Sequence, residues 1–265
     1  MVLKNICKFC GKEAKLIKAH IIPRKFYLDY KNEKYMLVNE LTGKFQIRQS
    51  GTHDNSILCE SCDSKILGVF EKEGYRVLFD EIYKHVAYKD DKTIVYHLTS
   101  DSYDYNKLRK FFISILWRAS ISSLPDFSHI QLGKYEGKAF EVLCNKNSHK
   151  HLLKIYIYKF PKHKDYNKFT YITKTKIANY KAFIINMAGY FIIMVIKGKN
   201  HPYTMSYPMK EMFLNDKGFY IIENEDLYNY HANIAQQKMQ RIWKKGIKPP
   251  FANKKLKVYY ATSNS

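Results

Sequence analysis

CKFC (residues 7–10) and CESC (residues 59–62) are the stretches that decide the fold of the first part of the chain. Each Cys-x-x-Cys can aim two thiolates at one metal ion, and four thiolates form the tetrahedral soft-ligand set that structural zinc prefers. Gly11 directly after the first pair suits the tight turn of such a knuckle. Chance thiols or a redox dithiol are the alternatives. The spacing favours a structural zinc site formed by Cys7, Cys10, Cys59 and Cys62.

The segment between the two knuckles contains KAHIIPR (residues 18–24). With the flanking cysteine pairs it resembles the zinc-bearing HNH endonucleases, in which a His-Ile-(Ile/Val)-Pro strand end precedes a loop and a second Cys-x-x-Cys that starts a helix. The similarity covers residues 7 to about 71 and continues loosely through residues 110–135. It implies a treble-clef zinc module with an HNH-like ββα-metal site, and a metal-dependent endonuclease that hydrolyses phosphodiester bonds.

Carried over by position, the resemblance makes His20 the general base that takes a proton from the attacking water. A divalent ion, Mg²⁺ or Mn²⁺, would stabilise charge on the phosphate and the leaving oxygen. Its ligands would come from the loop before the second knuckle and from the helix start, which offer His53, Asp54, Asn55 and Asp63. The sequence therefore predicts His20, Asp54, Asn55 and Asp63 as catalytic residues, with Asp54 and Asp63 on the ion.

Two positions differ from the common family pattern. Ala19 stands where Asp, His or Glu often precedes the base, and Asp63 stands where a histidine often follows the last cysteine. Counting back from the second knuckle, the family's asparagine falls on Asp54, and a shift of one residue would bring Asn55 there. Oxygen ligands suit hard Mg²⁺ or Mn²⁺, although both aspartates could instead cap a turn or a helix. Glu71, two turns further along the helix, could assist at this site, but it is interpreted as a solvated surface residue.

The charge of the chain favours a polyphosphate partner. Lys and Arg total 45 against 24 Asp and Glu, a formal net charge of +21. Residues 81–265 carry 31 of these bases and 14 of the acids, so the excess lies mainly there. Arg24 and Lys25, beside the predicted base, could contact the scissile phosphate. We expect a nucleic-acid partner, with DNA favoured over RNA. An AT-rich genome is the alternative source of so many lysines.

The whole sequence predicts an α+β protein with a zinc and nuclease module at residues 1–80 and a basic body of helices and antiparallel sheet at residues 81–265. Alternation predicts a hairpin from residues 35–38 and 44–48, a second around Gly189 from residues 182–187 and 190–196, and strands at 152–160, 169–175 and 219–222. Helices are predicted from Cys62 to a cap at Gly74, from an N-cap at Asp104 to Pro125, and over residues 231–244.

Other features bear on location and partners. Trp117-Arg118 is interpreted as core plus rim, and Cys144 as a small buried residue. Five cysteines, no apolar leader and no membrane-length apolar run favour the cytoplasm, without a membrane partner. The resemblance suggests a role in bacterial or phage defence. One alternative is a non-catalytic, zinc-stabilised nucleic-acid-binding protein. A third possibility makes the basic body a sensor, or a surface for a protein partner or homodimer.

Overall fold

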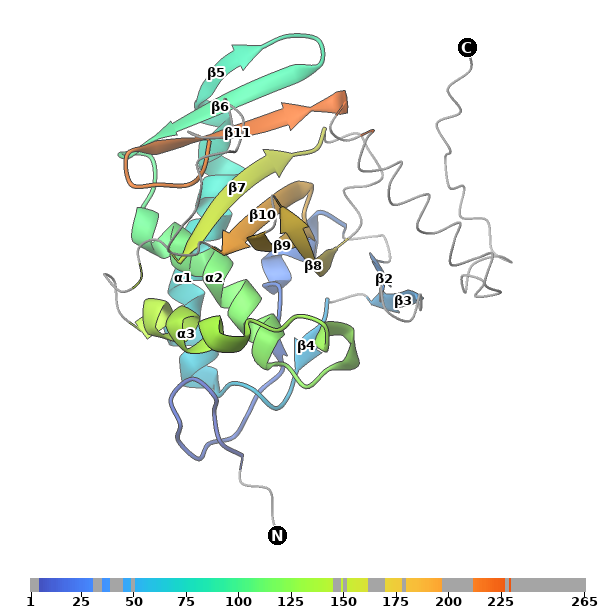
Figure 1. The fold of residues 1–265 in the computed structure, drawn as a ribbon, viewed down its shortest axis with the longest axis vertical. Coiled ribbons are helices and arrows are strands. Elements are labelled where there is room, and N and C mark those ends of the chain that lie inside the picture. Colours follow the sequence, from blue (N-terminus) through green and yellow to red (C-terminus); the bar gives the residue numbers. More distant parts are fainter. Residues whose placement is uncertain are drawn as a thin grey trace.

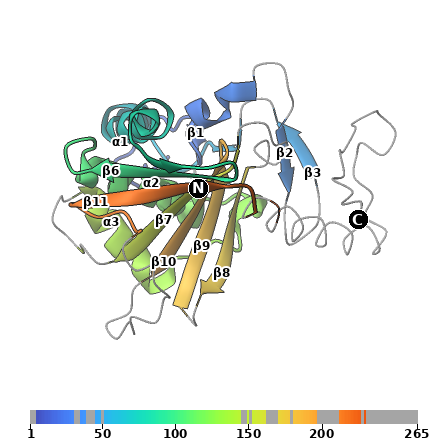
Figure 2. The ribbon, with the colours of Figure 1, turned by 90° about the horizontal axis from the view of Figure 1, so that it is seen from above.

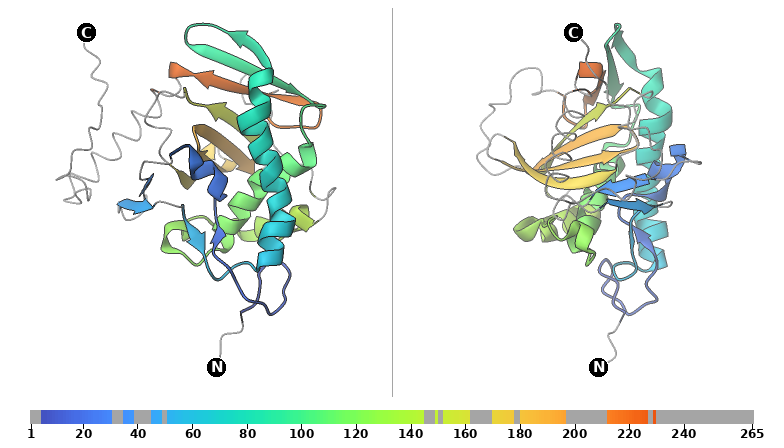
Figure 3. Two further views of the ribbon diagram at one scale, coloured as in Figure 1. Left: turned by 180° about the vertical axis from the view of Figure 1, so that it is seen from behind. Right: turned by 90° about the vertical axis from the view of Figure 1, so that its right-hand side faces the viewer.

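The computed structural model of the chain describes residues 5–30, 35–38, 45–48, 51–144, 149, 152–161, 170–177, 180–196, 212–226 and 229. At its centre lies helix α2, Tyr105–Ile121. The predicted N-cap is confirmed, because the Asp104 carboxylate accepts a hydrogen bond from the Lys107 backbone N–H at 3.0 Å. Every residue from Leu108 to Ala119 is buried. The helix is enclosed by α1, Gly68–Tyr75, by α3, Glu136–Cys144, and by a large sheet (Figure 3).

Seven strands form that sheet, in the order β5-β6-β11-β7-β10-β9-β8. All neighbours are antiparallel except β11 and β7, which are parallel. Helices α1 and α2 lie against one face of the sheet (Figures 1 and 2). The strands are β5 Val86–Lys89, β6 Thr93–Thr99, β7 Leu153–Lys159, β8 Tyr171–Ile177, β9 Tyr180–Met187, β10 Tyr190–Ile196 and β11 Gly218–Asn224.

Several predicted strands are confirmed. The β9–β10 hairpin turns at Ala188 and Gly189, whose φ angles of 50° and 78° suit the tight two-residue turn of a twisted hairpin. The small hairpin of β2, Tyr35–Val38, and β3, Phe45–Arg48, also forms. The predicted basic helix at residues 231–244 lies outside the described residues. The sequence patterns did not predict strands β5 and β6 or helix α3.

A continuous helical rod follows the second knuckle and corrects one prediction. It begins with a wide π-type segment, Ser61–Leu67, continues as α1, and runs on through Arg76–Glu81 and a short 3₁₀ turn, Ile82–Lys84. The helix therefore does not end at Gly74. A Cβ on Gly74 would lie 2.5 Å from the Phe111 ring, so this glycine allows the rod to approach α2 closely.

Short elements complete the fold. A 3₁₀ segment, Arg24–Tyr30, follows β1, Ala19–His20, and 3₁₀ turns at Pro125–Phe127 and Gly133–Tyr135 connect α2, which ends at Ile121, to α3. Cys144, at the end of α3, is exposed, so its interpretation as a buried residue is wrong.

One hydrophobic cluster joins the two predicted domains. It includes Cys7 and Ile21 from the first 80 residues, and Phe111, Ile157 and Phe219 from the rest. The boundary after residue 80 remains a prediction, and residues from both of its sides pack into this cluster. None of the described helices is both long and apolar enough to cross a membrane.

Candidate metal centre and histidine pair

The first knuckle is held by the backbone around it. Ile6 pairs with Glu13 in an antiparallel bridge, and the Gly11 N–H donates to the Cys7 carbonyl at 2.8 Å. Gly11 has a φ of +69°, a left-handed conformation that suits the tight turn expected at this position. The Lys8 N–H donates to the Ile57 carbonyl at 2.8 Å, which ties this loop to the segment that leads into the second knuckle.

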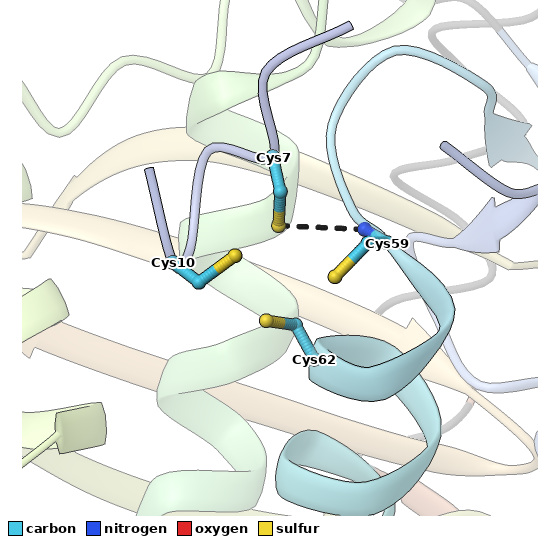
Figure 4. Close-up of side chains that lie close together, drawn as sticks. All are labelled: Cys7, Cys10, Cys59 and Cys62. Carbon is cyan, nitrogen blue, oxygen red and sulfur yellow. Dashed lines mark hydrogen bonds between the residues drawn. The ribbon is translucent and has the colours of Figure 1, made fainter. Parts of the chain in front are cut away.

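The four predicted cysteines form one cluster. Cys7 and Cys10 come from the loop, Cys59 lies just before the helical rod and Cys62 in its first turn, and the four sulfur atoms point toward one another (Figure 4). All Sγ atoms lie within 4.8 Å of one another. A tetrahedral zinc ion with bonds of about 2.3 Å places its sulfurs well within that limit. The donor set and its geometry fit a metal such as zinc, as the sequence predicted.

Backbone amides favour a thiolate in this cluster. Burial by itself would raise the pKa of Cys7, but N–H groups of Cys10, Cys59 and Phe9 outweigh it and lower the pKa to about 7. One of these contacts runs from the Cys59 N–H to Cys7 Sγ at 3.4 Å. Burial and the neighbouring sulfurs raise the pKa of Cys62. Four thiols crowded together without a cation cannot all ionise, and a bound Zn²⁺ would remove that conflict.

The predicted general base lies beside a second histidine. His20 ends β1, Ala19–His20, which pairs antiparallel with β4, His53–Asp54, so that His20 faces His53 and Ala19 faces Asp54. The two imidazole rings have centroids 5.7 Å apart and an interplanar angle of 55°. Both residues are partly exposed. Cross-strand partners share a face of the pair, so both rings lie on the same side.

Asp54 lies on the opposite, buried face. The residue is only 2% exposed, and its carboxylate accepts hydrogen bonds from Ser56 N–H and Oγ at 2.8 and 2.6 Å. Its other oxygen accepts from Ser122 Oγ at 2.7 Å and from the Ser123 N–H at 3.1 Å. Burial would raise the pKa of Asp54, but these hydrogen bonds outweigh it and hold the pKa below its ordinary value. Both oxygens of this carboxylate therefore accept hydrogen bonds from serines of two loops.

Asp63 sits beside a buried arginine. Its Oδ1 lies 3.7 Å from Arg118 Nη2, and Glu71 Oε1 accepts a hydrogen bond from the same nitrogen at 2.5 Å. Burial raises the pKa of Asp63, Arg118 lowers it, Glu71 raises it, and the net direction is upward. Arg118 is fully buried, so its assignment to a rim is wrong, and Glu71 is ion-paired rather than simply solvated.

The remaining predicted residues lie near the surface. Asn55 is exposed in the turn after β4. Arg24 is exposed at the start of its 3₁₀ segment, and the described residues give it no partner. Lys25 Nζ lies over the Tyr75 ring, 5.0 Å from its centroid. Arg24 is thus the freer of the two predicted phosphate contacts.

The predicted divalent-ion site is not preassembled. Among the described residues, the four cysteines are the group of three or more potential metal-ligating side chains whose ligand atoms cluster within 4.8 Å. Asp54 and the two histidines lie on opposite faces of the β1–β4 pair, and Asp63 is paired with Arg118. Since these residues do not converge, we derive no chemical step through a Mg²⁺ or Mn²⁺ ion.

Two residues of this site carried weak signals in the sequence. His53 was one of several polar residues in the loop before the second knuckle, and only the pairing of β4 with β1 selects it as the neighbour of His20. Arg118 stands in a strongly apolar helix stretch, where a cation without a nearby acid in sequence indicates a distant partner. No family model, curated protein or solved structure matches this chain.

Proposed function

We propose that this protein is a zinc-stabilised endonuclease that hydrolyses phosphodiester bonds in nucleic acid, with DNA favoured and with His20 as the general base. The observation that carries the proposal is the pair of partly exposed imidazoles, His20 and His53, on a strand pair that adjoins the four-cysteine cluster. The net charge of +21 supports a polyanionic substrate. The treble-clef and HNH identity of the module, and a role in bacterial or phage defence, belong to this same proposal.

Two imidazoles at this spacing can divide acid and base work. A neutral imidazole can accept a proton from water, and a protonated one can donate a proton to the leaving oxygen. We assign the role of base to His20, which is followed by the Ile-Ile-Pro segment that ends at Pro23, and the role of acid to His53. Arg24, exposed close by in the chain, would contact a phosphate. A divalent ion, if one takes part, would add charge stabilisation.

A second candidate function is a non-catalytic, zinc-stabilised nucleic-acid-binding protein. It is favoured by the Asp54 carboxylate, which serines cover, and by Ala19, which offers no ligand beside His20. In this alternative the histidine pair is part of a binding surface. Both candidates share the zinc site and the basic charge, so only a measurement of catalysis separates them.

The experiment presents the purified, zinc-loaded chain with supercoiled plasmid, linear duplex, single-stranded DNA and RNA. Each substrate is tested with Mg²⁺, with Mn²⁺ and with EDTA at a concentration that leaves the zinc content unchanged, and binding is measured in parallel. Cleavage of any of these supports the nuclease, and the EDTA arm decides whether a divalent ion is required. If the chain binds nucleic acid but cleaves none of these substrates, the second candidate function replaces the nuclease.

A further inference from the structure

Helix α2 contacts both strands of the histidine pair. Arg118 Nη1 donates to the His20 carbonyl at 3.0 Å, and Ser122 and Ser123, just after the helix, donate to Asp54 on β4. The Arg118 contact joins residues that are 98 positions apart in sequence, and the serine contacts join residues that are 68 and 69 positions apart. All of them cross the predicted domain boundary. The position of the β1–β4 pair therefore depends on the end of α2.

The Arg118 guanidinium also reaches the helical rod after the second knuckle. While one nitrogen holds the His20 carbonyl, the other contacts Glu71 at 2.5 Å and lies 3.7 Å from Asp63. One rigid planar group thus fixes the strand that carries the base relative to the rod that carries two carboxylates. A lysine ammonium has its donors on one nitrogen and could not make these contacts in the same fork geometry.

Burying this arginine carries a desolvation cost. Its side chain is fully buried, and its Nε has no hydrogen-bond partner among the described residues. Buried ion pairs are often replaceable by well-packed apolar side chains without loss of stability. An apolar residue at this position of α2 could fill the space, but it could not hold the His20 carbonyl.

We infer that Arg118 is a positioning residue, which holds the backbone at His20 so that its imidazole is aimed for proton transfer. This inference rests on the proposed function for its catalytic part. Its structural part, the restraint of β1 by α2, stands independently of any activity. It also implies that residues 1–80 require α2 for a competent site.

The test compares Arg118→Met with a matched substitution on the same helix. Arg109 is also a buried arginine, 2% exposed, and it donates to the His149 carbonyl, away from the histidine pair. Arg109→Met therefore reproduces the loss of a buried guanidinium without touching β1. Arg118→Lys, which keeps the charge, is the conservative variant. All variants are studied as the full zinc-loaded chain, and every rate is expressed per folded molecule.

Two readouts are measured for each variant. Amide hydrogen exchange of Ala19, His20 and Ile21 reports the restraint of β1, and we expect exchange about tenfold faster or more in Arg118→Met, with no change in Arg109→Met. Cleavage kinetics report the aim of the base. We expect kcat to fall by about tenfold or more in Arg118→Met at an unchanged KM, with partial recovery in Arg118→Lys.

Equal exchange rates and equal cleavage in Arg118→Met and Arg109→Met would overturn the inference. A rise in KM at constant kcat would also overturn it, because that result assigns Arg118 to substrate binding. If the wild-type chain cleaves no substrate, the proposed function fails. The exchange experiment then still decides the restraint: faster exchange in Arg118→Met alone supports it, and unchanged exchange refutes it.

Discussion

Replacing Asp54 by asparagine would distinguish a structural carboxylate from a metal ligand. Each carboxylate oxygen accepts one backbone N–H, from Ser56 on one side and from Ser123 on the other. An amide has one oxygen, so it can accept from only one of these two N–H groups. Its NH₂ group must then face the other N–H, whose position is fixed by the backbone. A lost hydrogen bond to a charged acceptor costs about 1.5–3 kcal/mol, and the buried N–H left without a partner adds to this loss.

We therefore expect Asp54→Asn to lower the free energy of unfolding by about 3 kcal/mol, measured by urea denaturation at neutral pH with zinc present. The matched control is Asp90→Asn. Asp90 accepts a similar set of hydrogen bonds, from Tyr88 and from the Lys92 and Thr93 N–H groups, but it is exposed and should matter less. Cleavage per folded molecule should be unchanged in both variants.

The effect of Asp54→Asn should also depend on pH. Because the folded-state pKa of Asp54 lies below its ordinary value of 3.8, the carboxylate stabilises the fold above that value. This contribution disappears as the pH falls through the folded-state pKa, so the gap between wild type and Asp54→Asn should narrow on acidification. An unchanged unfolding midpoint at neutral pH, or cleavage lost in a fully folded variant, would refute the structural role and favour the metal-ligand role.

Two further predictions concern the zinc site and the packing of the rod. Cys59→Ser, or removal of zinc by a strong chelator, should abolish binding of about one zinc ion per chain and lower the melting temperature; full metal-free stability would contradict this. Gly74→Ala should cost about 1–3 kcal/mol in urea denaturation, because its Cβ would meet Phe111 at 2.5 Å. Gly137→Ala, whose Cβ meets nothing within 4 Å, should stabilise α3 slightly, and equal effects of the two changes would refute the packing account.

The features that the sequence predicted well have local causes. Four cysteines in two Cys-x-x-Cys pairs specify one tetrahedral site whatever the intervening chain does, and the cluster forms. Helix α2 combines an N-cap, Asp104, with apolar residues at helical spacing, and both signals lie within the helix itself. The β9–β10 hairpin has alternating apolar residues on both sides of a two-residue turn at Gly189.

The features that the sequence did not predict depend on distant contacts. Glycine is common at helix ends, but Gly74 lies within the helical rod, where the lack of a side chain lets Phe111 of α2 pack closely against it. Asp54 has the chemistry of an ion ligand, but Ser122 and Ser123, which lie 68 and 69 positions later in the sequence, donate hydrogen bonds to its carboxylate. Arg118 was expected at a rim because arginine is seldom fully buried, and its acceptors lie on two elements far earlier in the chain.

The role of His20 as the base of a nuclease can be measured by comparing His20→Ala with His97→Ala. His97 lies on β6, stacked on Tyr220, and controls for the loss of a partly buried imidazole elsewhere in the fold. Cleavage of one defined DNA and binding of the same DNA are measured on the same samples. We expect His20→Ala to bind as wild type but to cleave at least about a hundredfold more slowly, while His97→Ala does both normally. Equal cleavage by His20→Ala and wild type would contradict this role.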